Sequence, residues 1–137
     1  MLRAKRGEFP AELAPAFDNG TSLAYEILEE DLPHFSADTR RIVAYVNRGT
    51  HHMKWDLDED RRLNHAELFG RFVREYPSVA PLLRNKLSFS QDNLRRNLTG
   101  LTDLQLSSSL SRDRLEFMIR LITVRQARLA AVLDSGE

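Results

Sequence analysis

Carboxylate side chains recur between residues 56 and 67 at a spacing that could serve metal chemistry. Asp56, Asp58 and Asp60 occupy alternate positions, and Glu67 follows seven residues after the last of them. Calcium is a hard cation that binds about six to eight oxygen atoms, and carboxylates are its commonest charged ligands in proteins. The pattern therefore makes residues 56–67 a candidate calcium-binding loop.

In sequence, residues 56–67 resemble the calcium loop of an EF-hand. The residues that match loop positions one, three, five, nine and twelve are Asp56, Asp58, Asp60, Asn64 and Glu67. The resemblance implies that these five residues would bind the ion, with Glu67 as the bidentate ligand. Trp55 before the loop and Leu68 after it also match the family pattern.

The loop departs from the EF-hand pattern at its sixth position. Arg61 stands where the family has glycine, and a non-glycine residue in the left-handed conformation costs about 1–2 kcal/mol. We therefore expect any calcium to bind with a dissociation constant no tighter than about 10⁻⁶ M. Arg48, His51 and His52 also replace apolar residues of the incoming helix, and no second loop accompanies this one.

A capped helix explains the same residues without a metal. Asp56 would be the N-cap, Glu59 would reach back to it, and Asp58 and Asp60 would interact with the positive end of the helix dipole. This interpretation accounts for every acidic residue of the pattern, and we favour it. The two interpretations differ in where the helix begins, near Leu57 for the capped helix and near His65 for the calcium loop.

Other chemistry finds less support in the sequence. His65 could join His51 or His52 and Asp56 in a zinc or iron site, which we rank below both interpretations of the loop. The chain has no cysteine, no glycine-rich phosphate loop, no G-x-S-x-G segment and no H-E-x-x-H segment. We expect a protein that is not an enzyme and that has no cofactor, with a weakly bound calcium ion as the alternative.

The charges are balanced, with 20 basic and 20 acidic residues. Such a chain has no long-range field that attracts nucleic acid. Three arginine pairs, at 40–41, 61–62 and 95–96, keep a nucleic-acid-associated protein as a second alternative function, although acidic residues lie close to each pair. Arginine supplies 17 of the 20 basic residues, which suits carboxylate or phosphate recognition, but GC-rich coding produces the same bias and we favour that explanation.

Apolar spacing of three and four residues predicts an all-α fold, a compact bundle of five or six helices. We expect an irregular N-terminal arm over residues 1–20 and one helical domain over residues 21–137. Proline, glycine and capping residues predict helices near residues 21–32, 36–48, 56–76 or 65–76, 78–87, 90–100 and 111–133. Gly70 would allow another helix to approach the third one closely.

The last helix has apolar residues on two faces. Leu115, Ile119, Ile122 and Leu129 belong to a broad stripe that would pack in the core of the domain. A second seam consists of Phe117, Leu121, Val124 and Ala131. Two apolar faces indicate either a helix buried at the centre of the bundle or a contact with another chain. We predict the contact and assign these four residues to an interface.

The N-terminus has basic residues but no apolar stretch that would make a secretory signal, and no window is apolar enough to span a membrane. We therefore expect a cytoplasmic protein that does not enter membranes. The function that we predict is a non-enzymatic protein interaction module, an adaptor, inhibitor or small subunit, that binds a protein or a second copy of itself through its last helix. A weak EF-hand-like calcium-binding regulator is the first alternative.

Overall fold

A computed structural model describes residues 23–50, 55–56, 58–102 and 110–135 of the chain. Six α-helices make up most of this part, with two short 3₁₀ helices, and no strand occurs among these residues. The helices are α1 (Leu32–Ala37), α2 (Thr39–Arg48), α3 (His65–Glu75), α4 (Ala80–Leu87), α5 (Gln91–Thr99) and α6 (Arg112–Asp134). The prediction of an all-α fold is confirmed. The predicted arm over residues 1–20 lies outside the described residues.

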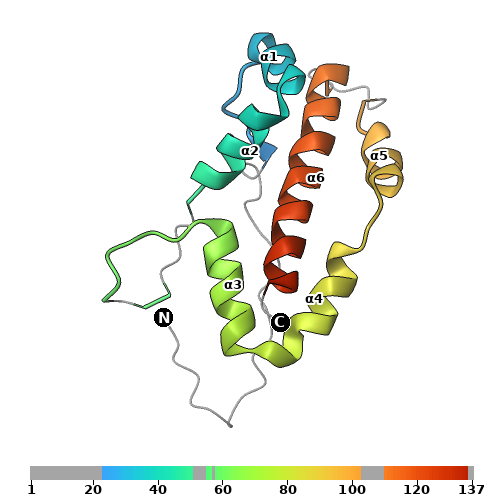
Figure 1. Ribbon diagram of the computed structural model, residues 1–137. Helices are drawn as coiled ribbons and strands as arrows, with labels where there is room; N and C mark the ends of the chain where they lie inside the picture. Colours follow the sequence, from blue (N-terminus) through green and yellow to red (C-terminus); the bar gives the residue numbers. More distant parts are fainter. Residues whose placement is uncertain (1–22, 51–54, 57, 103–109, 136–137) are drawn as a thin grey trace.

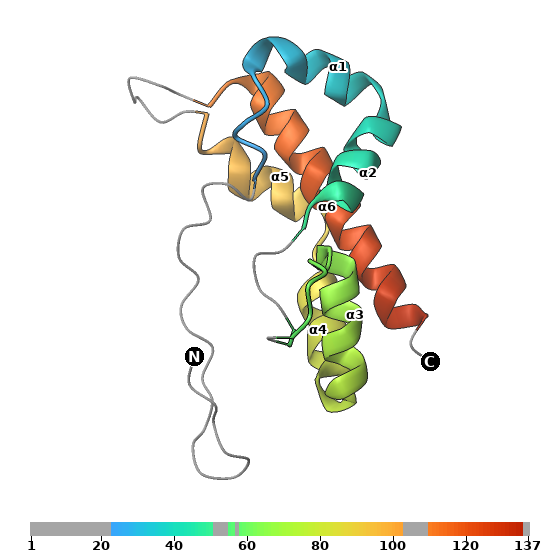
Figure 2. The same cartoon turned by 90° about the vertical axis from the view of Figure 1, so that its left-hand side faces the viewer.

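Helix α6 is the centre of the arrangement (Figures 1 and 2). Each of the other five helices contacts it, with α1, α2 and α3 on one side and α4 and α5 on the other in Figure 1. Ser111 caps its start by accepting a hydrogen bond from the Arg114 backbone N–H. A helix with neighbours on several sides must be apolar over most of its circumference, which explains the two apolar faces of this sequence.

The main core cluster lies between α6 and the N-terminal helices. Phe117 and Leu121 of α6 are fully buried, and they pack with Leu32 of α1 and Ile42 of α2. The prediction that Phe117 and Leu121 face another chain is therefore wrong. Neither side chain is accessible to another chain, because α1 and α2 cover this side of α6.

The other two residues of the predicted interface differ from each other. Val124 is half-buried and packs against the same cluster, so it too belongs to the protein's own core. Ala131 is exposed near the end of α6. Of the four residues assigned to the seam, only Ala131 is therefore exposed.

The prediction of a first helix near residues 21–32 is also wrong. Residues 24–28 form turns, with Ala24 at φ 57°, and a 3₁₀ helix over Glu29–Asp31 leads into α1. Pro33 lies in the first turn of α1, and not just beyond the end of a helix as the sequence predicts. A proline is tolerated there because its missing N–H would have no partner within the helix.

The later boundaries follow the capping residues closely. Asp38 caps α2 by accepting a hydrogen bond from the Arg40 N–H, so the helix starts about two residues later than expected, and it ends at Arg48, just before Gly49, as expected. Ser90 caps α5, which is also as predicted. Gly70 allows α3 to approach α6 closely, because a β-carbon on it would lie 3.0 Å from Cγ1 of Val132.

A turn segment packs over the first turn of α6. Arg114, whose side chain is only 12% exposed, donates hydrogen bonds to the carbonyl oxygens of Ala24 and Ile27 and pairs with the carboxylate of Glu29 at 2.8 Å. Glu29 also accepts a bond from the Ser111 hydroxyl, and these contacts lower its pKa, with the Ser111 bond as the largest cause. The segment is therefore fixed at the N-terminal end of α6.

Candidate binding groove

A groove of about 750 Å³ lies between α3 and the C-terminal part of α6. Its walls carry four arginines and three glutamates, and small or apolar residues contribute the rest. We call it the arginine groove, and it is lined by Glu59, Arg61, Leu63, Ala66, Glu67, Gly70, Arg71, Arg74, Glu75, Arg128, Val132 and Ser135. The predicted calcium loop and the last helix therefore meet at one place.

The start of α3 forms one end of the groove. Asn64 is its N-cap and accepts a hydrogen bond from the Glu67 N–H at 2.9 Å, while Glu67 accepts one from the Asn64 N–H at 2.9 Å. The two residues thus form a capping box. The helix begins at His65, so the prediction of a capped helix that starts near Leu57 is wrong.

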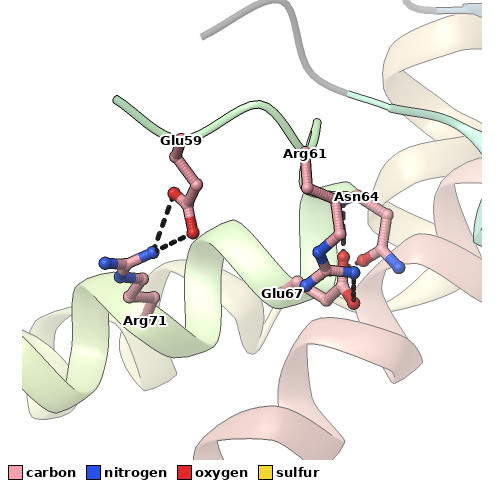
Figure 3. Close-up of polar contacts among 5 residues, drawn as sticks. All are labelled: Glu59, Arg61, Asn64, Glu67 and Arg71. Carbon is pink, nitrogen blue, oxygen red and sulfur yellow. Dashed lines mark hydrogen bonds and ion pairs between the residues drawn. The ribbon is translucent and has the colours of Figure 1, made fainter. Parts of the chain in front are cut away.

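Two arginines hold the loop against α3 (Figure 3). Arg71 donates to both carboxylate oxygens of Glu59, at 2.8 and 2.9 Å, and its guanidinium lies 5.2 Å from the centre of the Trp55 ring. Arg61 donates to Glu67 at 2.9 Å. The Asn64 N–H bond, followed by Arg61, lowers the pKa of the Glu67 carboxyl.

The predicted calcium ligands are not brought together. No cluster of three or more histidine, cysteine or acidic side chains suited to a metal occurs within residues 23–50, 55–56, 58–102 and 110–135. Asp56 accepts a bond from the Asp58 N–H at 3.4 Å, and Asp58 and Asp60 are exposed, while Asn64 and Glu67 are occupied by capping and by Arg61. The described residues thus do not present a formed calcium site. His51 and His52, of the suggested zinc or iron site, lie outside the described residues.

Two of the four arginines in the arginine groove, Arg74 and Arg128, differ from Arg61 and Arg71. Both are exposed, and neither forms an ion pair within the described part of the chain. A nitrogen of the Arg74 guanidinium lies 3.4 Å from the position of a β-carbon on Gly70, beside Val132. Arg128 lies one turn before Val132 on α6, so two unpaired guanidinium groups flank the place where the helices meet.

Neither Arg74 nor Arg128 stands out in the sequence. They are 54 positions apart in the chain, and only the packing of Gly70 against Val132 brings their helices together. The available signal was the excess of arginine over lysine, which indicates recognition of carboxylates or phosphates but does not indicate where.

The three arginine pairs lie on three different elements of the fold. They lie on α2, on the loop before α3 and on α5, and one member of each pair is bonded to a carboxylate. Arg40 bonds to Asp38, Arg61 to Glu67 and Arg95 to Glu116. A nucleic-acid backbone would have to displace these carboxylates.

Comparison with known proteins gives no family for this chain: no family model, curated protein or solved structure matches it. Among the described residues, none of the helices combines the length and the apolar character needed to cross a bilayer. The chemistry of the arginine groove is therefore the basis for inferring a function.

Proposed function

We propose that this protein is a non-enzymatic interaction module that binds another protein chain in the arginine groove. The observation that carries the proposal is that Arg74 and Arg128, which form no ion pair among the described residues, line the same groove as the apolar residues Leu63, Ala66 and Val132. Recognition surfaces for peptides commonly combine such an apolar centre with a polar rim. The last helix thus contributes to binding through its C-terminal end and not through the seam predicted from the sequence.

The side chains of the arginine groove are better suited to binding a partner than to catalysing a reaction. Guanidinium groups stay protonated at all ordinary pH values and cannot act as general bases. Glu59 and Glu67 are held in ion pairs, and the lowered pKa of Glu67 keeps it ionised. These side chains are therefore suited to binding charged and apolar groups of a partner.

Affinity capture from an extract of the source cells tests this function. The immobilised parent protein should retain one or more proteins that the double variant Arg74→Ala with Arg128→Ala does not. A matched control, Arg40→Ala with Arg112→Ala, removes two exposed arginines outside the groove and should retain the same proteins as the parent. If no captured protein depends on Arg74 and Arg128, the proposal is wrong.

A weak calcium-binding protein remains the second candidate. The observation that favours it is the start of α3 at His65, which is the start expected for a calcium loop. Binding would require Glu67 to leave Arg61 and the exposed aspartates to gather around the ion. A calcium titration of the parent and of an Arg61→Gly variant tests it.

A further inference from the structure

We infer that the partner bound in the arginine groove is a second copy of this chain, which inserts the segment of residues 25–31. This inference rests on the proposed function, because it names the occupant of the same groove. We call residues 25–31 the acidic segment. It would pair head to tail with the groove of the next molecule.

The acidic segment exposes apolar side chains that have no cover in the described part of the chain. Tyr25 is 67% exposed and Leu28 is 59% exposed, and they are among the most exposed large apolar residues of the protein. Exposed aromatic and aliphatic side chains close together are typical of contact sites. The floor of the groove, formed by residues such as Ala66 and Val132, offers the apolar surface that they lack.

The charges of the two surfaces are complementary. Glu26 bonds to the Tyr45 hydroxyl and Glu29 to Arg114, but Glu30 and Asp31 are exposed and form no side-chain hydrogen bond among the described residues. Two carboxylates thus remain to meet Arg74 and Arg128. Arginine binds carboxylates through paired hydrogen bonds, so this match is specific as well as attractive.

The composition of the groove makes a phosphate-rich partner less suitable. Glu59, Glu67 and Glu75 also line it, so the four arginines leave a net charge of only +1. A run of phosphates would be repelled by these carboxylates, whereas two carboxylates beside apolar groups fit the two unpaired arginines. The formal net charge of zero also means that copies of the chain do not repel one another overall.

A molecule cannot fill its own groove with its own acidic segment. Arg114 holds the segment at the first turn of α6, while the groove lies at Arg128 and Val132, about 21 to 27 Å further along a helix that rises about 1.5 Å per residue. The contact must therefore join two molecules, and it uses a different surface on each. Such head-to-tail contacts produce rings or open chains rather than closed two-fold dimers.

Sedimentation velocity of the full chain tests the inference. Between about 10 μM and 1 mM, the range in which small interfaces associate, the parent should pass from monomer to larger species, and about 0.5 M salt should reverse this because the paired charges are exposed. A groove variant, Arg74→Glu with Arg128→Glu, and a segment variant, Glu30→Lys with Asp31→Lys, should each stay monomeric over the range. The control Arg40→Glu with Arg96→Glu, which changes two exposed arginines outside the groove and the acidic segment, should associate like the parent.

The decisive measurement mixes the two monomeric variants. The groove variant keeps its acidic segment and the segment variant keeps its groove. The lysines of the segment variant also complement the glutamates of the groove variant, so a 1:1 mixture should recover association although each variant alone stays monomeric. A mixture that stays monomeric would overturn the inference, as would association of either variant alone. If a charge reversal lowers the melting temperature, Arg74→Gln with Arg128→Gln and Glu30→Gln with Asp31→Asn replace it, with dissociation constants at least about tenfold weaker than the parent's.

Sedimentation and affinity capture together give different results if only the inference fails and if the proposed function fails as well. A parent that is monomeric at every concentration, yet captures a protein through Arg74 and Arg128, would show that the groove binds a different partner. A parent that captures nothing through these arginines and does not associate would overturn both.

Discussion

Cγ1 of Val132 lies 3.0 Å from the point that a β-carbon would occupy on Gly70, so α3 and α6 leave no room there for a side chain. We expect Gly70→Leu to destabilise the protein by about 1–3 kcal/mol, because overpacking forces the helices apart. Gly100→Leu is the control, since nothing lies within 4 Å of its β-carbon position and its φ of −59° suits any residue. Urea unfolding measures both variants, and equal effects would contradict the close packing.

Phe117 should contribute to the stability of the single molecule and not to association. Its side chain is fully buried, so Phe117→Ala should cost about 3–5 kcal/mol, enough to unfold a marginally stable domain. Ala131→Lys, on the same helix but exposed and in its last turn, should change the stability by less than about 0.5 kcal/mol. Thermal unfolding by circular dichroism compares the two, and a mild effect of Phe117→Ala would show that the core has been assigned wrongly.

Arg61 should control any response to calcium. Arg61 pairs with Glu67 and stands where an EF-hand loop has glycine, although its φ is not positive in this structure. Arg61→Gly should free the carboxylate and allow the left-handed turn that a calcium loop needs. We expect the parent to bind no tighter than about 10⁻⁶ M and the variant to bind about tenfold more tightly or better. Isothermal titration measures both proteins. If neither binds calcium at millimolar concentration, residues 56–67 serve only to begin α3.

Glu67 should make stability depend on pH in the acidic range. Its pKa is lowered below 4.5 in the folded protein, mainly by the Asn64 N–H bond and then by Arg61, so folding favours the ionised form. The stabilisation is therefore present above the pKa of the unfolded chain and is lost as the pH falls through the folded value. Glu67→Gln keeps an acceptor for the Asn64 N–H but carries no charge, so its stability should decline less than the parent's between about pH 5 and pH 3. Parallel declines of the two proteins in denaturant titrations would contradict this assignment.

The sequence predicted those elements whose signals are local. Ser90, Ser111 and Gly49 mark helix ends correctly because capping and chain reversal depend on neighbouring residues. Pro33 misled the prediction because a proline fits the first turn of a helix as well as the position after its end. The fold class followed from helical periodicity, which several elements share.

The candidate site could be predicted only in part, since it depends on contacts between distant residues. The acidic loop was visible in sequence, but the start of α3 was decided by Asn64 and Glu67, whose capping box competes with an equally plausible one at Asp56. Whether the second face of α6 met its own chain or another could not be known without the positions of α1 and α2. The presence of Arg74 and Arg128 in one groove could not be predicted either, because it depends on the packing of Gly70 against Val132.

The central position of α6 has a consequence for how the chain acquires its structure during synthesis. The ribosome produces α1 to α5 before α6, yet each of them contacts α6. Isolated helices of this length are only marginally stable in water, so the earlier ones cannot bury their apolar faces until the last one has left the exit tunnel. Chains that stop before residue 112 should therefore remain unfolded, whereas chains that include the whole of α6 can fold in a single cooperative step.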